Sequence, residues 1–170
     1  SPDGRWIAFL SERRSPAGKG READEDSKDS DADKEVAQIY LISPNGGEAF
    51  PISVTDEEVH AFSWSADSKT IYFATRPPWG KEQKDAYKKT WKDTVQYRAS
   101  ERGDTIYELD LAGALERHAS SATKDTSEAE KDANVPLGAR AIASTPWRVY
   151  HLEASPDGRR LAFITSSISQ

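Results

Sequence analysis

Three acidic residues at alternate positions are the first candidates for chemistry in this 170-residue chain. Asp29, Asp31 and Asp33 have the spacing with which a calcium loop begins, because hard cations bind several oxygen ligands supplied from alternate positions. Lys34 stands where such a loop needs its turn glycine, and Tyr40 stands where it needs a bidentate glutamate. The pattern favours a solvated loop, and we predict no metal and no cofactor. If the chain did bind a metal, these three aspartates would be the candidate ligands.

The three histidines are the next candidates, either as metal ligands or as general bases. His60, His118 and His151 are scattered, and no second ligand lies at a helical or turn spacing from any of them. We expect His60 and His151 at partly buried or edge positions of equivalent strands, and His118 in a polar loop. The chain has no cysteine, which excludes disulfides and thiol catalysis. We therefore predict no metal cluster and no general base among the histidines.

The composition limits the partners. The chain has 29 acidic and 23 basic residues, for a net charge of −6, which argues against nucleic acid because such partners need clustered Lys and Arg. No apolar run approaches the roughly 20 residues that a membrane span needs, so we predict no membrane contact. Neither observation separates a cytoplasmic location from a periplasmic or secreted one.

One pattern of a turn followed by a strand occurs three times in the chain. The elements that it forms must position the candidate aspartates and histidines. It reads Ser-Pro-Asp-Gly-Arg-Trp-Ile-Ala-Phe at 1–9, returns as Ser-Pro-Asp-Gly-Arg-Arg-Leu-Ala-Phe at 155–163, and has a looser copy at 65–75. Pro, Asp and Gly favour a tight turn, and the alternating apolar residues that follow favour a strand. Three copies predict a repeated supersecondary unit.

Further strand signals complete the unit, at 38–42, 48–53, 59–65 and 105–111. An offset of 90 residues aligns the second and third copies without gaps, so that Val59 meets Val149 and Phe73 meets Phe163. Four short antiparallel strands per unit, with a turn signature between the first and second, are typical of a β-propeller blade.

Two long inserts interrupt the strands. In the first, Tyr87, Trp91 and Val95 have four-residue spacing, which predicts a short amphipathic helix within 79–98; a basic, aromatic ligand platform is the alternative. The second insert, from residue 112 onward, is polar and is expected to be a loop.

The predicted fold is therefore all-β: an incomplete β-propeller of about two to three four-stranded antiparallel blades, with long loop inserts and one short helical insert. A β-sandwich of about ten strands is the alternative, and the gapless repeat disfavours it. We expect the chain to be a piece of a longer protein. The expected division is a partial blade at 1–53 with an acidic loop at 18–35, a full blade at 54–146 with inserts at 77–103 and 112–138, and the start of a third blade at 147–170.

The turn-and-strand motif, followed by Gln-Ile-Tyr-Leu-Ile at 38–42 and Gly-Gly-Glu at 46–48, resembles a known blade repeat. The repeat is that of TolB-like propellers and of the amino-terminal propeller in prolyl oligopeptidase-family serine peptidases. The inserts are similar to those of the dipeptidyl and acylaminoacyl peptidase branch, on the motifs Arg76-Pro77-Pro78, Trp91-Lys92-Asp93 and Gly103-Asp104-Thr105-Ile106-Tyr107. The resemblance covers the repeat cores and is specific for the propeller type rather than for one enzyme.

The resemblance implies a noncatalytic propeller that gates peptide access to an α/β-hydrolase domain of the same parent chain. The expected partners are that domain and the peptide substrate, and the alternative is a TolB-like module for protein–protein interaction. The family's nucleophile elbow, Gly-x-Ser-x-Gly, has no counterpart here, so no catalytic residue is carried over. Some dipeptidyl peptidases of the family hold the substrate ammonium with a glutamate pair. Glu57 and Glu58 are the candidate pair, although their place after Thr55 and Asp56 favours a solvated turn.

Overall fold

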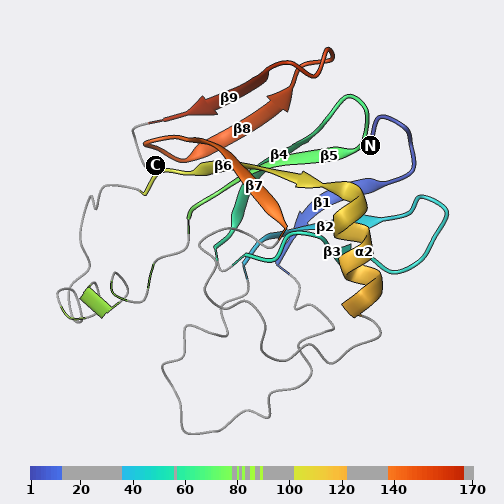
Figure 1. The fold of residues 1–170 in the computed structure, drawn as a ribbon, viewed down its shortest axis with the longest axis horizontal. Helices are drawn as coiled ribbons and strands as arrows, with labels where there is room; N and C mark the ends of the chain where they lie inside the picture. Colours follow the sequence, from blue (N-terminus) through green and yellow to red (C-terminus); the bar gives the residue numbers. More distant parts are fainter. Residues whose placement is uncertain are drawn as a thin grey trace, which may run out of the picture.

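A computed structural model describes residues 1–12, 36–55, 57–77, 80, 82, 85, 86, 89, 102–121 and 138–166 (Figure 1). Antiparallel strands form three separate sheets in these ranges, and helix α2 (Leu111–Ser121) follows one of the strands. The all-β, incomplete propeller fold is thereby confirmed, and there are three sheets rather than the two of a β-sandwich. No helix within the described ranges is long and apolar enough to cross a membrane.

The three sheets are versions of one unit. The first has the order β1 (Ile7–Ser11), β2 (Gln38–Ile42) and β3 (Phe50–Pro51). The second has the order β4 (Val59–Trp64), β5 (Thr70–Thr75), β6 (Thr105–Asp110) and β7 (Ala139–Ser144). The third pairs β8 (Val149–Ala154) with β9 (Leu161–Thr165).

The 90-residue offset holds in the strand register as well as in the sequence. Phe62 lies opposite Phe73 in the second sheet, and Leu152 lies opposite Phe163 in the third. Even the bulge repeats, because the register shifts between positions 59 and 61 of β4 and between positions 149 and 151 of β8. A bulge at the same place in both copies means that the repeat encodes backbone geometry as well as apolar alternation.

The turn before each second strand is held by one hydrogen-bond network. A serine hydroxyl donates to the aspartate Oδ1 two residues later at 2.6 Å, and the same serine Oγ accepts the amide five residues on at 2.9–3.0 Å. The aspartate Oδ1 also accepts the amide two positions further along. The Ser/Asp pairs are Ser1 with Asp3, Ser65 with Asp67, and Ser155 with Asp157.

The fourth turn position needs a positive φ, which explains the glycines there. Gly4 has φ of 71° and Gly158 has φ of 68°. The middle copy carries Ser68 at φ of 61°, a conformation that costs a residue with a Cβ. The Ser68 hydroxyl accepts the backbone amide of Asp3 at 3.0 Å, and this bond ties the first turn to the second. Ser68, which stands where the other two turns have glycine, thus makes a hydrogen bond that a glycine could not make.

The turn network makes a testable prediction about acid sensitivity. The Ser155 hydroxyl, followed by the Arg159 amide, lowers the pKa of Asp157 by hydrogen bonding to its carboxylate. A lowered folded-state pKa stabilises the fold above the unfolded-state pKa, and that stability is lost as the pH falls through the folded-state pKa. Ser155→Ala is expected to raise the pKa of Asp157 toward its ordinary value, measured by NMR titration of the carboxyl carbon. Asp67, whose partner Ser65 is intact, serves as the control; an unchanged Asp157 titration would contradict the prediction.

Two apolar clusters hold the sheets together, one on each face of the second sheet. Phe73 and Ile71 face the first sheet, and Ala74 and Ile106 face the third. Full burial of a Val, Leu, Ile or Phe side chain contributes roughly 1.5–3 kcal/mol through the hydrophobic effect. The buried members are Ile39, Leu41, Ile52, Val59, Ile71, Phe73, Tyr107, Leu109, Leu111 and Ala114 on one face, and Ala61, Ala74, Ile106, Val149 and Leu152 on the other.

The second insert corrects the sequence analysis, which expected a loop from residue 112. Helix α2 (Leu111–Ser121) follows β6 directly. Asp110 caps it, because its carboxylate accepts the Gly113 amide at 2.7 Å, and Leu111 and Ala114 bury one face. The alternation of apolar and polar residues in β6 continues into Leu111, and for this reason the sequence analysis did not recognise Asp110 as a helix cap. His118 therefore lies on a helix and stacks on Phe50 of the first sheet, with ring centroids 3.9 Å apart.

Two other expectations concern residues that the structure covers in part or not at all. In the first insert, Glu82, Asp85, Ala86 and Lys89 have helical backbone and exposed side chains. Tyr87, Trp91 and Val95, whose spacing predicted the amphipathic helix, lie outside the described residues. So do Asp29, Asp31 and Asp33 of the acidic loop.

Candidate functional site

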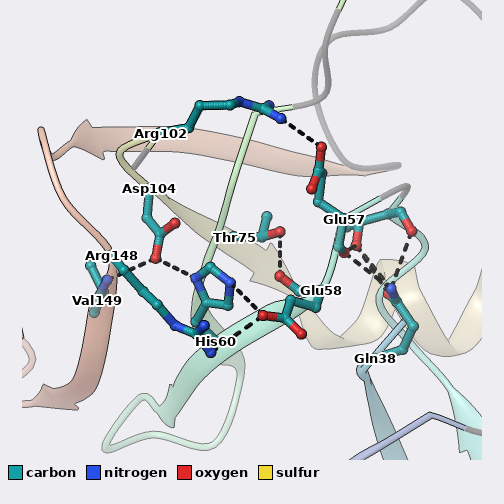
Figure 2. Close-up of polar contacts among 10 residues, drawn as sticks. Gln38, Glu57, Glu58, His60, Thr75, Arg102, Asp104, Arg148 and Val149 are labelled. Carbon is teal, nitrogen blue, oxygen red and sulfur yellow. Dashed lines mark hydrogen bonds and ion pairs between the residues drawn. The ribbon is translucent and has the colours of Figure 1, made fainter. Parts of the chain in front are cut away.

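Polar side chains gather at one end of the second sheet, where the polypeptide enters β4 and β6 and passes on to β8 (Figure 2). His60 is the second residue of β4, Asp104 directly precedes β6, and Arg148 directly precedes β8. Antiparallel neighbours alternate in direction, so the starts of β4 and β6 and the end of β5 lie at the same end of the sheet. The topology thus brings together residues that are more than forty positions apart.

His60 lies between two carboxylates, one at each ring nitrogen (Figure 2). Its Nδ1 is 2.6 Å from Asp104 Oδ2, and both side chains are fully buried. Its Nε2 is 3.0 Å from Glu58 Oε1, a contact with the distance of an ion pair but without the alignment of a hydrogen bond. Arg148 Nη2 lies 3.3 Å from the same Glu58 oxygen and supplies a positive charge.

Asp104 connects the second sheet to the third. Its Oδ2 accepts the Val149 amide at 2.8 Å, its own amide donates to the Trp147 carbonyl at 3.2 Å, and its carbonyl accepts the Thr145 amide at 2.8 Å. Its Oδ1 is buried without a hydrogen-bond partner. One residue therefore binds both the end of β7 and the start of β8.

Gly103 allows this close approach of the two chain segments. A Cβ at this position would lie 1.8 Å from the Thr145 carbonyl oxygen and 2.7 Å from the Pro146 carbonyl carbon, both backbone atoms. Any other residue would push the 145–147 segment away from Asp104. The glycine in front of the aspartate is therefore required by packing, since it lets the backbone-to-backbone bonds form.

A second polar group joins the first sheet to the same region. Glu57 Oε1 forms an ion pair with Arg102 Nη1 at 2.8 Å, and both side chains are about one-quarter exposed. The Gln38 side chain at the start of β2 donates to the Thr55 carbonyl at 3.1 Å and accepts the Ser53 hydroxyl at 2.9 Å. Glu57 and Glu58 are adjacent, but they turn to different partners, one to Arg102 and the other to His60 and Arg148 (Figure 2).

The geometry around His60 does not supply a nucleophile. In a serine–histidine–aspartate triad the imidazole Nε2 faces a serine hydroxyl, whereas here it faces the carboxylate of Glu58. The hydroxyl of Thr75, which lies in the same cluster, donates to the Glu58 backbone carbonyl at 2.8 Å. The two carboxylates flank opposite nitrogens, and no group of three His, Cys, Asp or Glu among the described residues is placed to hold a metal ion. The cluster pairs buried and half-buried polar side chains with one another, His60 with Asp104 and Glu58 with Arg148.

Comparison with known proteins adds no family to these observations. No protein-family model matches the chain, and no curated protein matches it either. Interpretation of the site therefore depends on its own geometry. Asp104 joins the second sheet to the start of the third through the Val149 amide and the Trp147 carbonyl, and Gln38 joins β2 to the segment that leads toward β4.

The sequence-based candidates have mixed positions. Glu57 and Glu58 enter the cluster, whereas the aspartates of the acidic loop lie outside the described residues. His151 lies on β8 with its side chain mostly exposed, 3.7 Å from Glu153. Sequence reasoning missed Asp104, Arg102 and Arg148. A usable signal was present: each is a charged residue within three positions of the start of a predicted strand, at the same end of the unit.

Proposed function

We propose that this chain is a noncatalytic β-propeller segment of a prolyl oligopeptidase-type serine peptidase, which gates peptide access to an α/β-hydrolase domain of the same parent chain. The observation that carries the proposal is the blade repeat itself. The turn network, the strand register and the bulge recur at an offset of 90 residues, on sequences that resemble the blades of that family. The occupied imidazole of His60 supports a structural part rather than a catalytic one.

Gating of this kind needs stiffness rather than reactive groups. A ring of blades excludes folded proteins by volume, so that only short or unfolded peptides reach the serine. Two features provide stiffness here: the buried clusters on both faces of the second sheet, and the charged contacts of Asp104 that fix β8 against β6. Glu57 and Glu58 already neutralise arginines, which leaves them poor ligands for a substrate ammonium.

Two measurements test this proposal. The purified chain is expected not to hydrolyse peptidyl chromogenic substrates, and hydrolysis that a serine-directed inhibitor abolishes would contradict the noncatalytic assignment. The coding sequence beyond residue 170 is expected to contain a Gly-x-Ser-x-Gly elbow followed by an aspartate and a histidine. A coding sequence without that elbow would overturn the peptidase assignment and favour a TolB-like interaction module.

A further inference from the structure

One further turn of the chain has the sequence of the repeat turns with a single change. It connects β2 to β3 and reads Ser-Pro-Asn-Gly at 43–46, whereas the repeat turns at 1–4 and 155–158 read Ser-Pro-Asp-Gly. The backbone closes in the same way in all three, because the glycine amide donates to the serine carbonyl at 2.9–3.1 Å. The turn at 43–46 therefore differs from the others at the side chain of its third residue, Asn45.

The aspartate of a repeat turn is held by hydrogen bonds, whereas the Asn45 side chain is not. Asp157 Oδ1 accepts the Ser155 hydroxyl at 2.6 Å and the Arg159 amide at 3.0 Å. The serine before Asn45 acts differently, since Ser43 Oγ accepts the backbone amide of Asn45 at 3.2 Å. Asn45 is exposed, and its side-chain amide has no hydrogen-bond partner among the residues that the structure describes. This amide can therefore turn toward the backbone of the next residue.

The next residue leaves its backbone nitrogen accessible. Gly46 has a φ of 104°, and a Cβ built at this position would have no atom within 4 Å. Gly47 follows with a φ of 110° and equally open surroundings. Neither glycine has a side chain that limits backbone rotation, so no side chain separates the Asn45 Cγ from the Gly46 nitrogen. These two atoms close a five-membered ring when they bond.

We propose that Asn45 is a site of spontaneous deamidation through a cyclic imide. The Gly46 nitrogen attacks the Asn45 Cγ and forms a C–N bond, and the side-chain nitrogen leaves as ammonia with the proton of the Gly46 amide. Water then adds to one of the two imide carbonyls and opens the ring, which gives aspartate or isoaspartate at position 45. Water is the co-reactant, and no group is oxidised or reduced. The site lies within the β2–β3 connection and is independent of the proposed peptidase assignment.

The two products differ in what they do to the turn. An aspartate at position 45 completes the Ser-Pro-Asp-Gly sequence, so its carboxylate can accept the Ser43 hydroxyl as Asp157 accepts that of Ser155. Isoaspartate instead routes the main chain through the side-chain carbon and lengthens the β2–β3 connection by one methylene group. One product thus restores the turn network of the repeat, and the other changes the backbone of the turn.

The turn network also explains why the aspartates of the repeat turns are expected to resist this reaction, although glycine follows them too. An aspartate forms the imide from its neutral acid, because a carboxylate is a poor electrophile. The Ser155 hydroxyl lowers the pKa of Asp157, and the Ser1 hydroxyl lowers the pKa of Asp3, by hydrogen bonding to the carboxylate. Both side chains therefore stay ionised and remain bound to their own partners.

The first test incubates the full 170-residue chain at physiological temperature and mildly alkaline pH and follows its tryptic peptides by mass spectrometry. Asn45 lies in the peptide 35–69, and Asn134, the other asparagine of the chain, lies in 132–140. Exchange of the amide NH2 for OH adds about 1 Da. We expect the Asn45 peptide to gain this mass at least about tenfold faster, because Val135 is β-branched and crowds the nitrogen that would attack Asn134. Equal rates would overturn the proposal.

A second incubation in guanidinium chloride tests whether the folded turn leaves Asn45 reactive. The Gly46 amide must leave the Ser43 carbonyl before its nitrogen can attack, and an exposed turn bond of this kind opens readily. The folded chain is therefore expected to react within about tenfold of the unfolded rate. Deamidation that occurs only in the denaturant would mean that the turn protects Asn45, and the proposal would fail.

Isoaspartate itself is measured with an isoaspartyl methyltransferase, which transfers a labelled methyl group from S-adenosylmethionine. We expect label in the peptide 35–69 and none in 149–159, which contains Asp157. Asn45→Gln is expected to remove the label from 35–69, and label that persists would place the reaction at another residue and overturn the assignment. Ser155→Ala removes a hydrogen bond from the carboxylate of Asp157 and is expected to introduce label into 149–159. A variant that stays unlabelled there would contradict the protective role of the turn network.

Discussion

Replacement of Asp104 by alanine is expected to lower the free energy of unfolding by about 3 kcal/mol or more. The substitution leaves His60 buried without its 2.6 Å partner and the Val149 amide without its acceptor. A buried hydrogen-bonding group left without its partner typically costs about 1–3 kcal/mol, because it has lost both water and its partner, and this substitution leaves two such groups. The measurement is urea unfolding followed by tryptophan fluorescence, with the midpoint and slope fitted separately.

Glu108→Ala is the matched control for this effect. Glu108 also pairs with a cation, Arg140, at 2.8 Å, but the arginine side chain is 72% exposed. Solvent screens such a pair, so its loss is expected to lower the urea midpoint much less than the loss of Asp104 does. If the two variants unfold at the same urea concentration, the buried cluster does not hold the sheets together and the structural interpretation of Asp104 fails.

A double-mutant cycle of Asp104→Ala with His60→Ala measures how much of the stability depends on the contact between these two side chains. Because the two side chains touch each other, their losses are not expected to add: the double variant should be less destabilised than the sum of the single variants. Additive losses would mean that Asp104 acts through Val149 and the 145–147 segment alone. The cycle therefore distinguishes a direct contact between the two side chains from a role of Asp104 in holding the backbone of the 145–147 segment and Val149.

The strands were predictable from the sequence because they repeat. Val59 and Val149, or Phe73 and Phe163, share side-chain type and register, and local alternation was enough to place each on a strand. Helix α2 was not predicted, since its first apolar residue, Leu111, continues the alternation of β6. The sequence does contain a helix signal at this point, a capping aspartate followed by apolar residues three and four positions apart, and it determines the structure here.

The candidate site was less predictable than the fold, for a physical reason. His60 and Asp104 are 44 residues apart, and nothing in the local sequence of either requires the other. Their contact follows from the order of strands in the second sheet, which places the entry of β4 beside the entry of β6. Side-chain chemistry at strand ends can be inferred only once the pairing of strands is known. Gly103 is similar, because the atoms that leave no room for a Cβ belong to Thr145 and Pro146, more than forty residues later.

Equivalent positions in the repeat differ in burial. Similar residues at these positions therefore need not contribute equally to the free energy of unfolding. Phe73 is fully buried and stacks on Tyr107 with ring centroids 5.4 Å apart. Phe163, its counterpart in the third sheet, is 44% exposed. The same residue in the same register thus has two environments, because the second sheet is covered on both faces by its neighbours.

Phe73→Ala is accordingly expected to lower the free energy of unfolding by about 3–5 kcal/mol, as large-to-small substitutions in a packed core do. Phe163→Ala is expected to cost about 1 kcal/mol or less, since much of its surface is already in contact with water. The two variants remove identical atoms, so the difference between their urea midpoints measures the effect of the environment alone. Equal losses would mean that the third sheet is covered in solution as fully as the second, and the sheet would then have a partner on its exposed face.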